Sequence, residues 1–336
     1  MRGASKSFRI PPVPAARPFA PRRSTIRPVA LFSLIAALLL DRARPLPSPN
    51  ILWIWFRRYA DRVARDLNAG QPIHGTAGWL AAVCPWVLAA LVVFYLLYYV
   101  NPLLGWVWTV AGLYACIGLR RVEQTLNDIF EALSAGDLES ARLLLSTWSG
   151  EPASVYAESE VARAAVETAL MRAHRELFGV LFWFIILPGP AGAILYRLAG
   201  ELARRWGGRK DEEFSAFGRF SARAFHYLDW VPLRLTAIGF AIAGDFEDAI
   251  TSWRTQASAW GDANDGVILA SGAGALGVRL GGPLPYEGGV DFRPELGDGD
   301  PADAHHLQSA QSLLWRTLVV WIILLLLLTL ARWVGG

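Results

Sequence analysis

Residues 76–100 run for 25 positions without one charged side chain, and this stretch limits the possible folds more than any other. As a helix it would rise about 37 Å, which exceeds the roughly 30 Å hydrocarbon core of a bilayer. Asn101 and Pro102 follow as a tight turn, and residues 103–119 return as a second apolar segment that ends at Arg120-Arg121. The pattern predicts a transmembrane hairpin.

Composition extends that prediction to the whole chain. Of the 336 residues, 54% are hydrophobic and only 18% are charged, and the apolar residues come in blocks. This is typical of an integral membrane protein rather than a soluble domain. Six arginines lie between residues 41 and 75, and Arg120-Arg121 follow the return segment. The excess of positive charge predicts that both ends of the hairpin face the cytoplasm.

The N-terminal segment differs from the rest. Residues 1–28 contain seven Lys/Arg, six prolines and no acid, so they cannot bury a core and should form a disordered basic tail. An overlong translation start, with the real chain beginning near Val29, explains the same composition. We divide the remainder into a membrane domain over residues 29–316 and a C-terminal transmembrane anchor over 313–333. Nucleic-acid binding has no support beyond the basic tail.

Four shorter segments also predict membrane contact. Residues 29–40 are apolar but give only about 18 Å of helix, which is marginal for a span. Residues 51–67 are aromatic on one side and Arg-rich on the other, typical of an interfacial helix. Residues 177–198 favour a re-entrant hairpin bent at Pro188-Gly189-Pro190, with a kinked single span as the alternative. Residues 230–243 are short and carry Arg234, which should pair with Asp229 or Glu167.

The remaining stretches read as soluble. Residues 122–176 show apolar stripes at helical spacing, and residues 255–312 read as loops with one helix near 302–312. Gly272 to Gly277 satisfy G-x-G-x-x-G, but no strand precedes them, so close helix packing explains them better than a nucleotide site. Arg279, just after this run, is a candidate donor to an anion. Cys84 and Cys116 lie in apolar runs and should be core residues.

A polar stripe enters the membrane region between residues 161 and 200. The segment starts as an amphipathic helix and becomes almost wholly apolar after Leu177. Glu167, Met171 and His174/Arg175 fall on one face of that helix, because they are spaced about four residues apart. Intramembrane polar groups are expensive and mark either a functional site or a buried structural ion-pair network. Both interpretations stay open on these residues alone.

Four ordered phrases carry a family resemblance. They are VARAAVE…LFW (161–183), GPAGAILYR (189–197), LDWVPLRLTA (228–237) and GAGALGVRLGGP (272–283). Together they resemble the CobD/CbiB family of membrane proteins in cobalamin biosynthesis, over about residues 29–316. The resemblance implies an all-α, polytopic membrane protein of the bacterial inner membrane. It also implies an enzyme that uses ATP to join an aminopropanol unit to adenosylcobyric acid.

The chain departs from the family's polar motifs. Glu167 is kept, but the enzymes' following acid, amide and acid fall on Met171, Arg172 and Arg175. Carboxylates there could hold Mg²⁺ with a nucleotide phosphate or act as acid and base. Their Tyr-Arg continues here as Tyr196-Arg197 without the later Asn and Asp, a paired Asp is replaced by Phe225-His226, and only Asn264 and Gly266 survive of an Asn-containing motif. Arg175, His226 and the run Leu228-Asp229-Trp230-Val231-Pro232 resemble the AmpE-like branch of the superfamily, whereas the glycine-rich AGALGVRLGG (273–282) is more like the enzymes.

Two functions follow from the resemblance. The one we favour at this point is a non-catalytic, AmpE-like signalling or ligand-binding protein without a cofactor or a metal. The alternative is a working cobinamide synthase, which would require ATP and Mg²⁺. The expected partners are the lipid bilayer and either a membrane protein, a corrinoid or an anionic small molecule. The anionic ligand is expected because the candidate centre is rich in arginine. The candidate site residues are Glu167, Arg175, Tyr196, Arg197, His226, Asp229, Arg234, Asn264 and Arg279.

Overall fold

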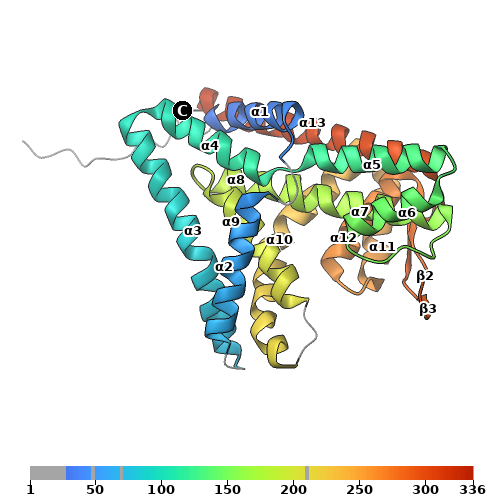
Figure 1. Cartoon of the computed structure of the whole chain (residues 1–336). Helices are drawn as coiled ribbons and strands as arrows, with labels where there is room; N and C mark the ends of the chain where they lie inside the picture. The colour runs from blue at the N-terminus through green and yellow to red at the C-terminus, as the bar shows by residue number, and fades with distance from the viewer. Residues whose placement is uncertain (1–27, 47–49, 69–70, 209–211, 336) are drawn as a thin grey trace, which may run out of the picture.

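The protein is almost entirely helical, as predicted (Figure 1). This computed structural model describes residues 28–46, 50–68, 71–208 and 212–335. The proposed basic tail therefore lies outside the described residues, apart from Pro28. The α-helices are α1 (Pro28–Ala43), α2 (Ile51–Leu67), α3 (Pro72–Val100), α4 (Pro102–Cys116), α5 (Leu119–Ser134), α6 (Leu138–Ser149), α7 (Glu158–Ala173), α8 (Gly179–Ile186), α9 (Ala191–Leu202), α10 (Glu212–Ala243), α11 (Phe246–Gln256), α12 (Ala263–Leu276) and α13 (Ala304–Gly335).

Three segments of the described chain are long and apolar enough to cross a membrane. They are Ile73–Val100, Pro102–Ser134 and Ala304–Ala331, so the chain is a membrane protein. The first two form the predicted hairpin, in which Asn101 caps α4 by accepting a hydrogen bond from the Leu103 N–H at 2.8 Å. The third covers most of the stretch predicted as a C-terminal anchor, residues 313–333. Their outward faces are apolar; Leu96, Leu103 and Leu327, for example, are all exposed.

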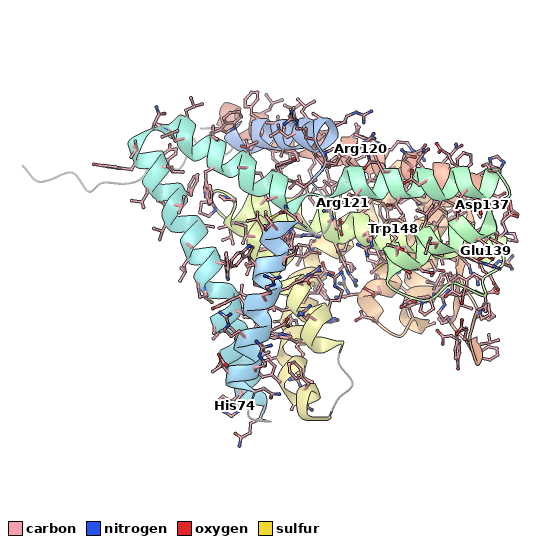
Figure 2. All side chains as sticks on the ribbon, viewed as in Figure 1. His74, Arg120, Arg121, Asp137, Glu139 and Trp148 are labelled. Atoms are coloured by element: carbon pink, nitrogen blue, oxygen red, sulfur yellow. The ribbon has the colours of Figure 1, made fainter. Side chains whose placement is uncertain are left out.

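The helices form two groups, and their buried residues form two clusters. In Figure 1, α4 and α5 run end to end, with α1 and α13 beside them, while α2, α3 and the first part of α10 project from this layer. Arg121 lies near the junction of the two groups, and Asp137 lies at the far end of α5 (Figure 2). The larger core extends from Leu34 to Leu325, and a second cluster joins α2, α3, α9 and α10.

A helical hairpin replaces a straight helix after residue 158. Helix α7 continues through a π-helical turn, η1 (His174–Phe178), into α8, and the chain then reverses at Pro188-Gly189-Pro190 into α9. Gly189 adopts a φ of 60°, which a glycine takes without strain. The structure thus has the bend that the re-entrant interpretation needs. None of the three candidate spans includes it.

Gly192 allows α9 to approach α8. A Cβ at this position would lie 1.9 Å from the backbone oxygen of Trp183. Gly192→Val should therefore destabilise the protein by about 1–3 kcal/mol, because backbone atoms must move to admit the side chain. The measurement is thermal unfolding in detergent. Gly261→Val is the control, since a Cβ there meets nothing within 4 Å. Equal, mild effects would contradict a tight α8–α9 contact.

The short segment predicted at residues 230–243 is the second half of the 32-residue helix α10. Pro232 lacks an amide N–H, so the Leu228 carbonyl loses its helical partner. The indole N–H of Trp183 donates to this carbonyl at 3.0 Å, which satisfies it and fastens α8 to α10. The prediction that Arg234 pairs with Asp229 or Glu167 was wrong. Its guanidinium stacks 3.9 Å from the Trp230 ring centroid and donates to the Trp230 carbonyl.

The region from 255 to 312 is more ordered than the sequence indicated. It contains η3 (Ala257–Ala259), α12, and β1 (Val278–Gly281), β2 (Leu284–Tyr286), β3 (Gly289–Asp291), β4 (Glu295–Leu296) and β5 (Asp300–Pro301). Strand β1 pairs antiparallel with β4 and parallel with β5, and β2–β3 form a hairpin. The prediction of loops was wrong here because Gly and Asp residues cap and pack α12. Gly272 and Gly274 contact Leu170 and Asp248, in the close packing that the sequence predicted.

Candidate functional site

One cavity of about 690 Å³ gathers most of the candidate residues. Its wall is built from α2, α5, α7, η1, α9, α10 and α12, so helices far apart in the sequence contribute to it. This volume lies in the range of about 300–1,000 Å³ typical of small-molecule sites. Seven of the nine predicted residues line it: Glu167, Arg175, Tyr196, Arg197, His226, Asp229 and Asn264.

Arginines dominate one end of the cavity. Glu176, a buried residue of η1, is the centre of this arginine end. Arg172 Nη1 lies 3.2 Å and Arg197 Nη1 3.8 Å from its Oε1. Arg57 and Arg204 both pair with Glu201 at the same end, and Arg121 completes the lining. Five guanidinium groups thus face two carboxylates, which leaves a net positive charge suited to an anion.

The arginines also decide the ionisation of Glu176. Burial raises the pKa of this carboxyl group, but the attraction of Arg197, Arg121, Arg172 and Arg204 outweighs it and holds the pKa below the ordinary 4.5. A lowered pKa in the folded state means that ionisation stabilises the fold above pH 4.5. That contribution is lost as the pH falls through the lower folded value.

Glu176→Gln should reveal this linkage. The variant should be less stable than the parent protein at neutral pH, because the amide cannot attract the surrounding arginines. The difference should shrink as the pH is lowered below 4.5, where the parent glutamate takes up its proton. Thermal unfolding in detergent across this range measures it. A difference that stays constant with pH would mean that the carboxylate is not the stabilising form.

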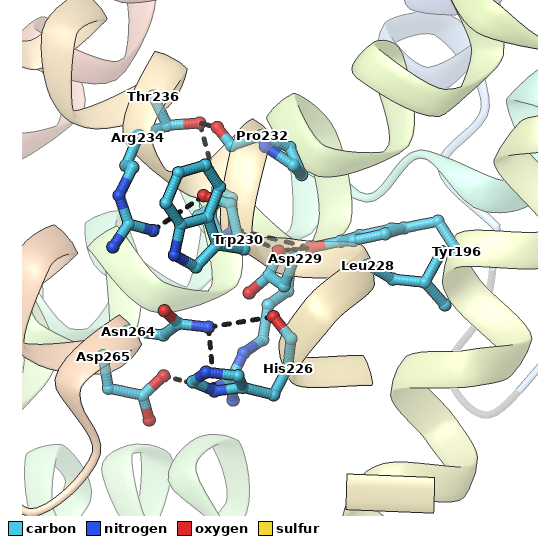
Figure 3. Close-up of polar contacts among 12 residues, drawn as sticks. Tyr196, His226, Leu228, Asp229, Trp230, Pro232, Arg234, Thr236, Asn264 and Asp265 are labelled. Carbon is cyan, nitrogen blue, oxygen red and sulfur yellow. Dashed lines mark hydrogen bonds and ion pairs between the residues drawn. The ribbon is translucent and has the colours of Figure 1, made fainter. Parts of the chain in front are cut away.

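Carboxylates gather around Arg175, in a second group of cavity residues that we call the acidic end; Figure 3 shows two of them, Asp229 and Asp265. Asp229, Asp262 and Asp265 line it, together with Arg175 and the pair His226–Asn264. Arg175 Nη2 donates to Asp265 Oδ1 at 2.6 Å, and Asn264 Nδ2 lies 3.2 Å from His226 Nδ1. Three acids against one guanidinium leave this end negative overall. The cavity therefore has a positively charged arginine end and a negatively charged acidic end.

Glu167 ties the strand region to α7. Its Oε1 accepts a hydrogen bond from the Gly281 N–H at 2.7 Å, and its Oε2 accepts one from Arg293 Nη1 at 2.9 Å. Arg293 also stacks over Trp260, another residue of the cavity wall. The carboxylate is thus engaged by two protein donors, which favours a structural role for it.

Two predicted residues lie elsewhere. Arg234 is engaged by Trp230 on α10, as described above. Arg279, on β1, is exposed and lies 3.9 Å from Glu295. Neither lines the cavity, so the cationic character comes from other arginines. The structure does not bring these two residues to the cavity, because the face of a helix or strand that turns inward is set by tertiary packing and not by the spacing along the chain.

Four acids of the cavity wall were not predicted: Glu176, Glu201, Asp262 and Asp265. Asp262 is the N-cap of α12 and accepts from the Asn264 N–H at 2.8 Å, and Asp265 sits in the first turn. An Asp followed by a run of apolar and small residues is a helix-start signal. That signal was available at 262–265, although the glycines around it obscured the helix.

The described residues offer no ready metal site. No group of three or more His, Cys, Asp or Glu side chains there is arranged to hold a metal ion. Glu176, Glu201 and Asp265 are engaged by arginines, Asp262 by backbone amides, and Asp229 by His174 and Tyr196. A Mg²⁺ ion required by an ATP-dependent reaction is therefore not matched by a resident site in this part of the chain, and we derive no step through one.

Comparison with known proteins gives a consistent result. The sequence model of the CobD/Cbib protein family matches residues 34–314. A relative named cobalamin biosynthesis protein CobD, from Stutzerimonas stutzeri, is 38% identical and covers 88% of this chain and 96% of its own length. Proteins of the same name from Chromobacterium violaceum and Synechocystis are 36% and 32% identical, over 87% and 80% of this chain and 94% and 79% of their own lengths. No solved structure matches.

Proposed function

This chain belongs to the CobD/Cbib protein family, and from that premise we propose that it is a working synthase of cobalamin biosynthesis. The proposed reaction joins the amine of an aminopropanol unit to a carboxyl group of adenosylcobyric acid as an amide, with ATP as the energy source. We also propose that the protein is a multi-pass protein of the bacterial inner membrane, with the cavity open to the cytoplasmic side. The arginine distribution around the hairpin supports this orientation.

The main support for this proposal is that the cavity has both an arginine end and an acidic end. Amide formation driven by ATP needs one place for phosphate groups and another for a primary amine. The arginine end supplies guanidinium groups, which bind phosphate and carboxylate oxygens well. The acidic end supplies carboxylates for an ammonium or amine. Both lie in one cavity of about 690 Å³.

The departures from the family motif no longer argue against catalysis. The non-catalytic interpretation depended on the loss of acids at Met171 and Arg175. In space, Asp265 lies 2.6 Å from Arg175, and Glu176 lies between Arg172 and Arg197. The cavity therefore keeps its carboxylates, although they come from other positions. The relatives named above give no support to an AmpE-like or signalling role.

Complementation tests the proposal. A bacterium that lacks its CobD/CbiB enzyme should grow on cobyric acid as the sole corrinoid precursor when it carries this chain. The Stutzerimonas relative, expressed in the same mutant bacterium, is the comparison for growth. The chain should be expressed from Met1 and again from Val29, and its presence in the membrane should be checked. No growth from either version, with protein present in the membrane, would reject the synthase activity.

A further inference from the structure

A buried hydrogen-bond network holds Asp229 at the cavity wall. Its Oδ1 lies 2.8 Å from His174 Nε2 and accepts a hydrogen bond from the Tyr196 hydroxyl at 2.7 Å. The three residues come from α10, η1 and α9, and His174 is fully buried. Among the described residues, both hydrogen bonds of this carboxylate end on Oδ1. Figure 3 shows the second oxygen turned away from Tyr196, toward Asn264.

Thr236 holds the His174 ring from the other side. Its Oγ1 lies 3.0 Å from Nδ1 and also lies 3.0 Å from the Pro232 carbonyl, four residues earlier on α10. Nε2 faces the Asp229 carboxylate and donates to it. The ring is therefore fixed between Thr236 and Asp229, with one nitrogen directed at each.

Local backbone geometry builds this arrangement. His174 begins the π-helical turn between α7 and α8, and such turns are frequent at functional sites because they shift the side-chain register. Gly179, just after the turn, leaves room for Tyr196. A Cβ there would lie 2.3 Å from the tyrosine oxygen. The Tyr196 hydroxyl can therefore reach Asp229 only because residue 179 is a glycine and has no side chain.

The charges around Asp229 keep it ionised. Burial raises the pKa of this carboxyl group, but the attraction of His174, the hydrogen bonds from His174 and Tyr196, and Arg175 outweigh burial and lower it. Arg175, on η1, is itself paired with Asp265 of α12. The other titratable group on α10 that lines this end is His226, which is bonded to Asn264. Asp229 is therefore a carboxylate with one oxygen fixed by the protein.

We propose that Asp229 Oδ2 receives the primary amine of the substrate, and that His174 and Thr236 are positioning residues that orient this carboxylate. An ammonium group donates well to a carboxylate oxygen whose partner oxygen is already held. The identity of the amine rests on the proposed function. The existence of an amine-binding carboxylate at this end of the cavity does not.

Direct binding tests the role of Asp229. Full-length protein in detergent should bind 1-amino-2-propanol, and Asp229→Asn should weaken this affinity about tenfold to a hundredfold, the loss expected for a hydrogen bond to a charged group. The uncharged analogue 1,2-propanediol should be insensitive to the substitution. Asp66→Asn, an exposed acid on α2, is the matched control. An unchanged amine affinity in Asp229→Asn would overturn the proposal.

Loss of the Asp229 carboxylate alone leaves the buried His174 Nε2 without its carboxylate acceptor and can prevent folding. The double variant Asp229→Asn/His174→Gln replaces both partners and keeps hydrogen-bonding side chains at both positions. It should fold and still lose the amine affinity. Inorganic pyrophosphate should bind to it as to the parent protein, because the arginine end is unchanged. A folded double variant that binds the amine normally would equally overturn the proposal.

The pH profile separates positioning from simple packing. Amine binding should fall at acid pH as Asp229 takes up a proton. His174→Gln removes the attraction and the hydrogen bond by which the histidine lowers the pKa of Asp229, so this acid limb should move to higher pH. Thr236→Val should weaken binding, because Nδ1 loses its hydrogen-bond partner, and Thr236→Ser should restore it. An unshifted limb in His174→Gln would show that the histidine only fills space.

Different results would reject the proposed synthase activity and the proposed amine site at Asp229. Parent protein that binds the amine through Asp229 but does not complement the mutant bacterium would reject the synthase activity and keep the amine site. Parent protein that complements, with an Asp229→Asn variant whose KM for the amine is unchanged, would reject the amine site and keep the synthase.

Discussion

Replacing Arg197 by leucine should weaken the binding of inorganic pyrophosphate about tenfold to a hundredfold. Arg197 lies at the arginine end, 3.8 Å from Glu176 and 5.2 Å from the Trp53 ring centroid. Its side chain is 17% exposed, and its Nε is buried without a hydrogen-bond partner among the described residues. A charge-assisted hydrogen bond from such a group contributes about 1.5–3 kcal/mol, which corresponds to the stated loss of affinity.

Arg58→Leu is the control for this experiment. Arg58 lies on α2, next to the cavity residue Arg57, but it is exposed and does not line the cavity. It carries the same charge, so both variants lower the net charge of the protein equally. Titration of the purified proteins in detergent with pyrophosphate compares them. If both lose affinity equally, the anion responds to overall charge and the arginine end is not a site.

The membrane segments were the most predictable part of the fold. A run without charges must be a helix in a bilayer, because every backbone group has to be satisfied within the segment. The interfacial helix also has the bounds that its aromatic and arginine faces indicated, Ile51–Leu67. Its N-cap, Asn50, accepts from the Leu52 N–H, which fixes the start. Local chemistry alone determines such elements.

The candidate site was only partly predictable. The spacing of Glu167, Met171 and Arg175 brought all three into the cavity wall, although a π-turn begins between the last two. The partners of these residues could not be read from the sequence. Asp265 is 90 residues from Arg175, and Arg293 is 126 residues from Glu167. Only tertiary packing decides such pairs, which is why Arg234 and Arg279 were wrongly placed in the same centre.

The position of the acids changes the functional interpretation. A motif comparison treats each position separately, so Met171 and Arg175 read as lost carboxylates. The cavity shows that a carboxylate can be supplied by another helix, because Asp262 and Asp265 enter from α12 at the same place. A substituted motif thus shows where a family's acids are missing in sequence. It does not show that the site lacks acids.

Glu167→Ala should destabilise the protein by about 3–5 kcal/mol, the usual cost of breaking a buried ion pair by removing one partner. The side chain is 9% exposed, and its loss would leave the Gly281 N–H and both Nη groups of Arg293 without their carboxylate acceptor, with only Arg293 Nε still bonded, to the Gly282 carbonyl. Glu158→Ala, an exposed acid in the first turn of the same helix, should cost less than about 1 kcal/mol. Denaturant unfolding in detergent measures both.

Glu167→Gln distinguishes the two roles that the sequence left open for this residue. The amide oxygen can still accept from Gly281 N–H, so the variant should lose less stability than Glu167→Ala, about 1–3 kcal/mol. If Glu167 is the structural tie that its contacts indicate, a folded Glu167→Gln protein should complement the cobalamin mutant as the parent does. Normal stability with loss of growth would instead place this carboxylate in the chemistry, and the cavity would then contain a catalytic acid next to Arg293.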